Sequence, residues 1–217
     1  PGCRRQKSGE HEVGEQPGGE ELLSGSQADK GWRQLHPPGN FPKPAEAADS
    51  NRGKLEASRQ TGVTRFIYVS SPAVASSGAA HVGTGALPAD PSTTKTHYAR
   101  SKAEAEQLVL TQSGSDMLVA SLRPHLVWGP GDEQLVARII GRAASGSLRL
   151  IGSGAALVDS TYVDNAADAI AASLERAEII DGRALVISNG EPRPVAELLR
   201  GLCHAAGFEL PLRGVPT

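Results

Sequence analysis

A tyrosine and a lysine stand four positions apart in the stretch THYARSK, residues 96–102. If this stretch is helical, Tyr98 and Lys102 project from one face, because positions i and i+4 are neighbours on a helix. A phenol loses its proton only near pH ~10, but an adjacent ammonium group stabilises the phenolate and lowers that pKa. Such a pair can move a proton to or from a substrate oxygen. The same spacing often occurs without function on solvated helices, so the surrounding elements decide between the two interpretations.

The elements around this pair have the pattern of an α/β sheet. The run TRFIYVSS (64–71) is β-branched and aromatic, which predicts a strand buried on both faces. It ends in Ser70 and Ser71, and α/β sheets place ligand-binding groups at the carboxyl ends of their strands. Residues 96–114 are predicted as a helix, and MLVASLRP (117–124) as a second buried strand.

Helix and strand signals continue to alternate toward the carboxyl terminus. Asp164 is predicted to cap a helix over 165–177. This alternation predicts an α/β fold with a parallel sheet. The further predicted helices cover 54–62, 132–146 and 194–207, and the further predicted strands cover 147–152, 157–163 and 183–188.

Composition excludes several classes of function. The chain has 217 residues, enough for one domain, and its net charge is −2. This balance, with only 4% aromatic residues, argues against a nucleic-acid partner. Cys3 and Cys203 form no disulfide framework and no metal-ligand cluster, so no metal is expected and a cytoplasmic location is favoured. No apolar run reaches the roughly 18 residues of a transmembrane helix.

The first 50 residues differ from the rest of the chain. They contain eight glycines and six prolines, and few large apolar side chains. We expect residues 1–50 to be a disordered or atypical segment that contains an extended linker over 36–44. The sequence starts at Pro1 and its one methionine is Met117, which we interpret as a fragment, a processed product or an imperfect gene model.

Four motifs in order resemble the extended short-chain dehydrogenase/reductase family, which includes the NAD-dependent epimerases and dehydratases. Among its branches the chain looks most like the 3β-hydroxysteroid dehydrogenase/isomerase and sterol-4-carboxylate 3-dehydrogenase group. The resemblance covers roughly residues 51–217. The motifs are GVTRFIYVSSPAV (62–74), YARSKAEAEQLV (98–109), LRPHLVWGPGD (122–132) and DSTYVDNAADAI (159–170).

The resemblance implies a role for each matching residue. Tyr98 is the general acid/base, and Lys102 lowers its pKa and binds the nicotinamide ribose. Ser71 hydrogen-bonds the substrate oxygen, with Ser70 as the alternative. The implied cofactor is NAD or NADP, with NAD favoured. The residues implied around the cofactor are Tyr98, Lys102, Ser70, Pro124, His125 and Leu126.

The resemblance also implies an architecture. It implies the C-terminal part of a Rossmann-like, doubly wound parallel sheet with a small substrate-binding subdomain. The partial dinucleotide-binding domain would cover 51–217, and the substrate-binding segments about 125–160 and 189–217. A homodimer is left open.

The glycine fingerprint that holds a dinucleotide pyrophosphate is missing from this sequence. GTG (83–85), GPG (129–131) and GSG (152–154) each lack the third glycine and the preceding strand. We therefore expect the chain as given to bind NAD(H) weakly or not at all, and the strand over 64–71 to expose an apolar edge.

The resemblance implies an NAD(P)-dependent oxidoreductase acting on a CH–OH group of a small molecule, with a 3β-hydroxysteroid or a sterol-like compound as the favoured substrate. Two alternatives stay open. One is a nucleotide-sugar epimerase or dehydratase on the same scaffold. The other is a catalytically impaired fragment or binding module, and the missing glycine fingerprint favours this alternative.

Overall fold

The structure, a computed structural model, describes residues 44–75, 83–114, 116–208 and 214–215. All of them belong to one of the two units of the chain, Phe41–Thr217. Most of the segment predicted as disordered or atypical, residues 1–43, lies outside the described residues, as do residues 76–82 of the predicted loop and most of the residues after 208. The proposed division of the chain into segments therefore stays a prediction.

Parallel strands form the largest sheet of the described residues, which has three strands in the order β1 (Arg65–Val69), β2 (Leu118–Pro124) and β7 (Arg183–Ile187). β2 is the central strand, and its side chains from Val119 to Arg123 are buried. These strands fall within the predicted runs 64–71, 117–124 and 183–188. The predicted α/β fold with a parallel sheet is confirmed.

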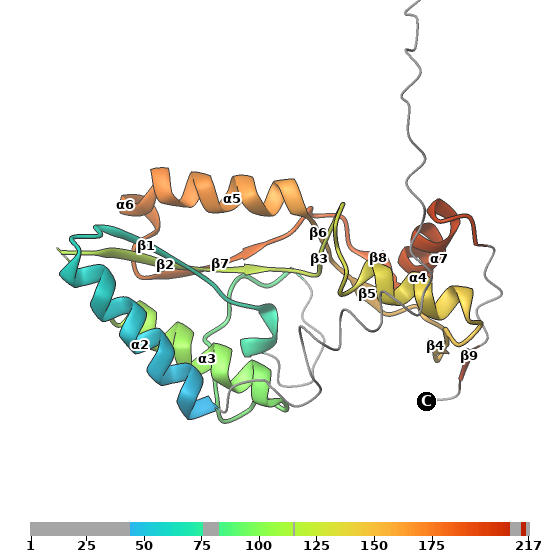
Figure 1. The fold of residues 1–217 in the computed structure, drawn as a ribbon, viewed down its shortest axis with the longest axis horizontal. Coiled ribbons are helices and arrows are strands. Elements are labelled where there is room, and N and C mark those ends of the chain that lie inside the picture. Colours follow the sequence, from blue (N-terminus) through green and yellow to red (C-terminus); the bar gives the residue numbers. More distant parts are fainter. Residues whose placement is uncertain (1–43, 76–82, 115, 209–213, 216–217) are drawn as a thin grey trace, which may run out of the picture. The chain divides into compact units, whose positions relative to one another are not determined.

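Helices cover both faces of this sheet (Figure 1). On one face α3 (His97–Leu110) packs on β2, and α2 (Pro44–Gln60) packs on α3. On the other face α5 (Val163–Glu175) packs on β1, and α6 (Ala177–Ile180) packs on β2. A parallel sheet needs this double covering because both of its faces are apolar.

The core of this layered region lies between the sheet and the helices α2 and α3. Four buried side chains from α2, α3 and the start of β2 pack together, and Phe66 and Tyr68 of β1 extend the cluster from the sheet. Burial of such apolar surface is the main force holding the layers together. The four buried residues are Leu55, Val109, Met117 and Val119.

Helix α2 begins earlier than the sequence predicted. It starts at Pro44 rather than near residue 54, so residues 44–50 of the segment predicted as disordered or atypical are helical. Proline is tolerated in the first turn of a helix, and the alanines and the glutamate that follow favour a helix. The helix ends as predicted near Gly62, which has φ = 75° and donates its N–H to the carbonyl of Arg59 at 3.0 Å.

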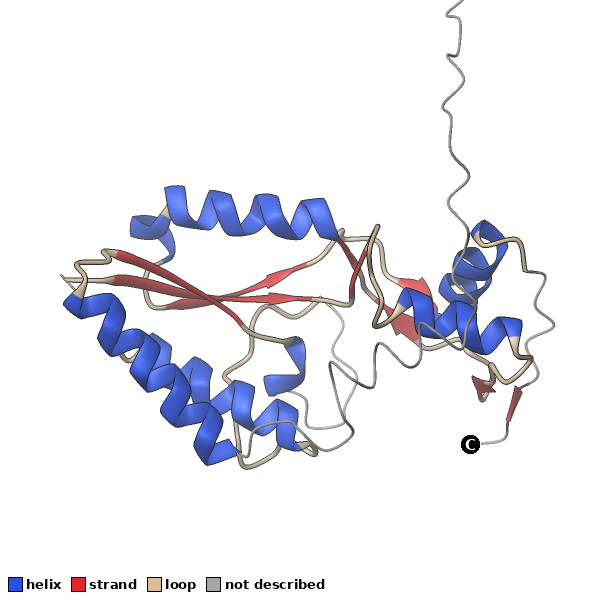
Figure 2. Ribbon diagram, viewed as in Figure 1, coloured by secondary structure: helices blue, strands red, loops and turns tan. Residues whose placement is uncertain are grey.

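Short strand pairs replace the longer strands predicted over 147–163 (Figure 2). Each strand of these pairs has two residues, and the predicted strand 157–163 is divided into β5 and β6. Helices α4 (Val136–Ala144) and α7 (Val195–Ala205) pack against each other beside them. The pairs are β3 (Val127–Trp128) with β6 (Thr161–Tyr162), β4 (Leu150–Ile151) with β9 (Gly214–Val215), and β5 (Leu157–Val158) with β8 (Arg193–Pro194).

Among the described helices, none combines the length and the apolar character needed to cross a bilayer.

Candidate functional site

Helix α3 carries the tyrosine and lysine identified in the sequence. Thr96 is its N-cap, and the Thr96 hydroxyl accepts a hydrogen bond from the backbone N–H of Ala99 at 3.1 Å. This cap starts the helix one residue before Tyr98, which therefore lies in its first turn. The Tyr98 side chain is 45% exposed, so its phenol is open to a ligand.

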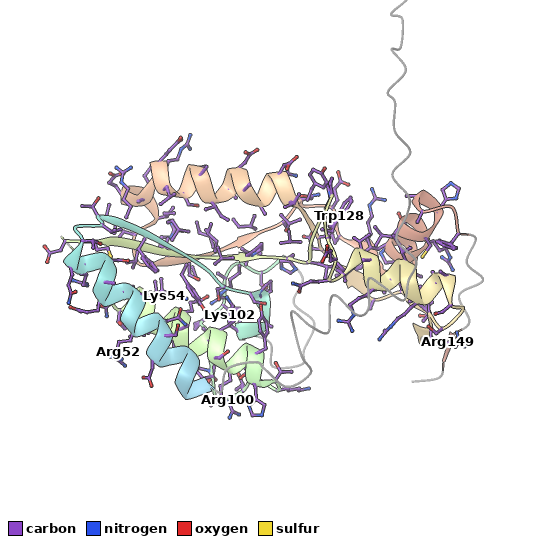
Figure 3. All side chains as sticks on the ribbon, in the orientation of Figure 1. Arg52, Lys54, Arg100, Lys102, Trp128 and Arg149 are labelled. Carbon is purple, nitrogen blue, oxygen red and sulfur yellow. The ribbon has the colours of Figure 1, made fainter. Side chains whose placement is uncertain are left out.

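Lys102 lies one turn further along α3 and points at the end of β1. Its Nζ donates a hydrogen bond to the Val69 carbonyl at 2.8 Å and lies 5.0 Å from the centroid of the Tyr68 ring. Burial first, and then the charge of Lys54 on α2, lower the pKa of Lys102. Figure 3 shows both lysines on the side of α2 and α3 that meets the sheet.

Tyr68 is a second tyrosine at this site that the sequence analysis did not select. Burial first, and then the negative charges of Glu106 and of ionised Tyr98, raise the pKa of Tyr68 to about 12. Tyr68 therefore stays a neutral phenol at physiological pH. Lys102 lies over the Tyr68 ring and so faces β1, and Tyr98, four positions earlier on α3, projects from the same side of the helix.

The two serines at the end of β1 have different environments. Ser71 is partly exposed, and its hydroxyl accepts a hydrogen bond from the N–H of Ala73 at 3.3 Å, at the start of the short 3-10 helix η1 (Pro72–Ala75). The Ser70 side chain is only 5% exposed, and its hydroxyl is fully buried with no well-formed hydrogen bond to the described residues. Ser71 is therefore the more accessible hydroxyl for a ligand.

A buried ion pair lies beneath this site, between α3 and β2. Arg123 Nε donates to Glu106 Oε2 at 3.0 Å, and a second donation from Arg123 Nη2 to Glu106 Oε1 makes the pair bidentate. Ser121 Oγ also donates to Glu106 Oε2, at 2.8 Å. The third contact of the guanidinium, from Nη1 to the Leu87 carbonyl at 2.6 Å, ties in the loop that leads toward α3.

The ion pair controls the ionisation of Glu106. Burial on its own would raise the pKa of Glu106, but the hydrogen bonds from Arg123, the nearby hydroxyls of Ser70 and Ser121, and the charge of Arg123 lower it overall. Glu106 is 0% and Arg123 2% exposed, so the two charges depend on each other. One feature of the sequence indicates this pair, because Glu106 is a charged residue on the same face of α3 as Ala99 and Ala103. All three of these residues are buried.

The residues predicted to line the nicotinamide pocket lie at the carboxyl end of β2. Pro124 closes the strand, and the His125 N–H donates to the Ile187 carbonyl of β7 at 2.8 Å. The side chain of Leu126 is 36% exposed, and its carbonyl accepts from the Thr161 N–H at 3.1 Å. The structure thus holds this segment at the same edge of the sheet as Ser71, while its contact with a cofactor stays a prediction.

The motif WGPGD continues from this edge into the region of short strands. Figure 3 labels Trp128, the first large side chain of this motif. The rings of Trp128 and Tyr162 pack edge to face with centroids 5.4 Å apart, and Trp128 Nε1 donates to Ser160 Oγ at 3.2 Å. Asp132 Oδ1 accepts the N–H groups of Gln134 and Leu135, both at 2.9 Å, and so holds the turn before α4. These contacts make the motif a scaffold for this region.

The prediction that Asp164 caps α5 is wrong. The N-cap is Tyr162, and Asp164 lies exposed in the first turn with no side-chain cap hydrogen bond. Asn189 has the stabilising role instead, because its Oδ1 accepts from the Tyr162 N–H at 3.1 Å and from Asn165 Nδ2 at 3.0 Å. An acidic residue in the first turn still interacts favourably with the helix dipole.

The sheet, its helices on both faces and the polar groups at the strand ends define the class of Rossmann-like α/β proteins. Residues 50–215 match the model of the 3-beta hydroxysteroid dehydrogenase/isomerase family. The chain belongs to this family, and the resemblance found in the sequence is confirmed.

Relatives and solved structures agree with this assignment. A 2-alkyl-3-oxoalkanoate reductase of Stenotrophomonas maltophilia is 41% identical over 70% of this chain and 48% of its own length. A 3beta-hydroxysteroid-dehydrogenase/decarboxylase of Arabidopsis thaliana, isoform 1, is 34% identical over 75% of this chain and 39% of its own length. The structure of RMD from Pseudomonas aeruginosa complexed with NADPH is 26% identical, with a TM-score of 0.58, over 80% of this chain and 63% of that one. The chain spans about half the length of the curated relatives it matches.

Proposed function

We propose that this protein is an NAD(P)-dependent oxidoreductase that interconverts a CH–OH group and a ketone, with Tyr98 as the general acid/base. The observation that supports this most is the position of Lys102, partly buried between the Tyr68 ring and the Val69 carbonyl on the Tyr98 face of α3. An ammonium group there favours the phenolate of Tyr98. The family membership and the names of the relatives support the same activity.

The residues present fit the nicotinamide half of a cofactor. A lysine has three N–H donors, and one donor of Lys102 binds the Val69 carbonyl, so donors remain for ribose hydroxyls. The glycine fingerprint for the pyrophosphate is not in this sequence. The cofactor, when bound, supplies a hydride acceptor or donor. Lys102 and the segment Pro124, His125 and Leu126 are the residues proposed to hold its nicotinamide end.

The proposed chemistry of the chain concerns a single proton. In alcohol oxidation the phenolate of Tyr98 accepts the hydroxyl proton while the carbon gives up its hydride, and in ketone reduction Tyr98 returns the proton. Ser71 donates a hydrogen bond to the reacting oxygen and orients it. The accessible hydroxyl of Ser71 favours it over Ser70 for this role.

The proposed substrate is a hydrophobic molecule with an oxygen on its third carbon. The names of the relatives, a 2-alkyl-3-oxoalkanoate reductase and a 3beta-hydroxysteroid-dehydrogenase/decarboxylase, share this feature. Leu126 and Val127, 36% and 38% exposed, offer apolar surface just after the proposed nicotinamide segment. A panel of a 3β-hydroxysteroid, a 2-alkyl-3-oxoalkanoate and a nucleotide sugar tests this proposal, and turnover of the nucleotide sugar alone would favour an epimerase or dehydratase.

The role of Tyr98 is tested by Tyr98→Phe in the product of the complete gene, with reduction and oxidation followed through nicotinamide absorbance. We expect kcat to fall by about 10²- to 10⁴-fold, because general acid/base catalysis contributes that much. The matched control is His97→Ala, an exposed neighbour on the same turn, which should keep its activity. Activity of Tyr98→Phe within tenfold of the unmodified protein would refute the proton-transfer role.

Cofactor binding by the chain as given is a separate question. Because it has no glycine fingerprint, we propose that its affinity for NAD(H) is weaker than micromolar, and calorimetry measures this directly. A cytoplasmic location and a homodimer are further proposals, and light scattering on the purified protein tests the latter.

A further inference from the structure

We infer that Tyr68 is a positioning residue whose aromatic face holds the ammonium group of Lys102 beside Tyr98 through a cation–π contact. The inference rests on the proposed function of Tyr98 and Lys102, and it adds a residue that acts through Lys102. The direct observation is geometric: Lys102 Nζ lies 5.0 Å from the Tyr68 ring centroid and is fixed from a second side by the Val69 carbonyl. A cation within about 6 Å of an aromatic face is attracted by its quadrupole.

The register of the sheet places Tyr68 under α3. Tyr68 of β1 lies opposite Ser121 of β2, and paired residues of neighbouring strands point to the same face. Ser121 donates its hydroxyl to Glu106 of α3, so this is the face that α3 covers. Tyr68 therefore points toward the helix that carries Lys102, with part of its ring against the core.

The obvious competitor for Lys102 is already occupied. Glu106 lies four positions after Lys102 on the same helix, a spacing at which a lysine and a glutamate can pair. Both Glu106 oxygens are instead used by Arg123, with Ser121 adding a third bond. Lys102 instead contacts the ring of Tyr68 and the carbonyl of Val69.

The Tyr68 ring has the properties needed in a cation–π partner of Lys102. Its pKa is raised to about 12, so the ring stays neutral and does not compete with Tyr98 for the substrate proton. The charged or titratable groups around Lys102 and the Tyr68 ring come from four elements. They are Lys54 of α2, Tyr98 and Glu106 of α3, Tyr68 of β1 and Arg123 of β2.

The first experiment titrates Lys102 through the ¹³C signal of its Cε carbon in the protein, in Tyr68→Phe and in Tyr68→Leu. We expect Tyr68→Phe, which keeps the ring, to leave the pKa of Lys102 unchanged. Tyr68→Leu removes the stabilisation of the ammonium and should lower that pKa by about half a unit or more, given the usual strength of a cation–π contact. An unchanged pKa in Tyr68→Leu, or equal shifts in both variants, would overturn the inference.

A second experiment keeps the shape of the ring, in case Tyr68→Leu does not fold. Phenylalanine with one, two or three fluorines at position 68 weakens the negative face of the ring stepwise. The pKa of Lys102 should fall with each added fluorine. A pKa of Lys102 that does not follow the number of fluorines would contradict the cation–π role of Tyr68.

Kinetics then separate this inference from the proposed function. In Tyr68→Leu the apparent pKa that governs alcohol oxidation should rise, because the ammonium no longer lies beside the Tyr98 phenolate, and Tyr68→Phe should restore the original profile. A shift in the Lys102 titration without any change in turnover would support the cation–π role of Tyr68 and refute the proposed role of Lys102. If the Lys102 titration does not shift, the cation–π role of Tyr68 is refuted whatever the turnover shows.

Discussion

The region around α3 and the region of two-residue strands are held in place by different kinds of contact. In the first, strands of five and seven residues and a buried ion pair hold α3 against the sheet. In the second, pairs of two-residue strands connect loops, and Leu157 is 60% exposed. Groups that move protons need fixed geometry, whereas loops can change their substrate contacts without disturbing it. The comparison assigns proposed chemistry to the first region and proposed specificity to the second.

The strongest way to break this comparison is to remove one charge of the buried pair. Arg123→Met leaves the Glu106 carboxylate buried with Ser121 as its remaining described donor, and we expect a loss of about 3–5 kcal/mol in the free energy of unfolding. Urea denaturation followed by circular dichroism measures it. The matched control is Arg65→Met, which breaks the exposed pair with Glu178, and should cost about 1 kcal/mol or less. Equal losses in the two variants would contradict the special status of the buried pair.

Truncation of an apolar side chain should also lower the free energy of unfolding much more in the first region than in the second. Met117→Ala empties a site that is 1% exposed, and the cavity should lower the free energy of unfolding by about 2–4 kcal/mol. Leu157→Ala removes a side chain that is mostly in solvent, so the change should stay within about 0.5 kcal/mol. Thermal unfolding of both variants compares them, and a larger loss at Leu157 would show that the second region has the tighter core.

Gly154 sharpens the comparison, because it is a closely packed position within the region of two-residue strands. Gly154 has φ = 67°, and a methyl group there would meet both Cδ atoms of Leu150 at 2.6 and 2.7 Å and the Cβ of Ala196 at 2.8 Å. We expect Gly154→Ala to cost about 1–3 kcal/mol through strain and overpacking. Gly131→Ala, also at positive φ but with no atom near its Cβ, is the control for the backbone effect alone. Equal stabilities of the two variants would exclude a packing contribution at Gly154.

The smallest effect concerns Asp181, which links the end of α3 to the sheet. Its carboxylate accepts from Ser113 Oγ and from the Val119 N–H, both at 2.7 Å, and these bonds, together with that from Gly182, lower its pKa. Because the pKa is lower in the folded than in the unfolded state, the stabilisation is present above the ordinary aspartate range and is lost as the pH falls through the folded value. Asp181→Asn should cost at most about 1 kcal/mol at neutral pH, since solvent screens the site. Urea midpoints that differ equally at pH 7 and at pH 3 would contradict this origin.

The sequence predicted best the elements whose pattern is long and local. The run 64–71 became β1, and the helix over 96–114 became α3, because a β-branched run and a capped helix need no distant partner to be recognised. The strands within 147–163 were predicted less well. Their pairing depends on residues such as Arg193, far along the chain, so their length could not be read from local apolar runs.

The candidate site was predicted in part. The spacing of Tyr98 and Lys102 is visible in the sequence because it lies within one helix turn. The pair of Glu106 and Arg123 depends on the register between α3 and β2, and the contact of Tyr68 with Lys102 depends on that between α3 and β1. Neither register can be derived from a single sequence, because it is set by packing in three dimensions.

The Arg123–Glu106 pair also constrains how this protein can be redesigned. A library that randomises either position alone samples mainly variants with an orphaned buried charge, whereas joint replacement by two apolar residues of similar volume avoids that intermediate. Directed evolution by single steps should therefore leave positions 106 and 123 unchanged and accumulate its changes in the loops beyond Leu126. Changing the pair takes a simultaneous double substitution.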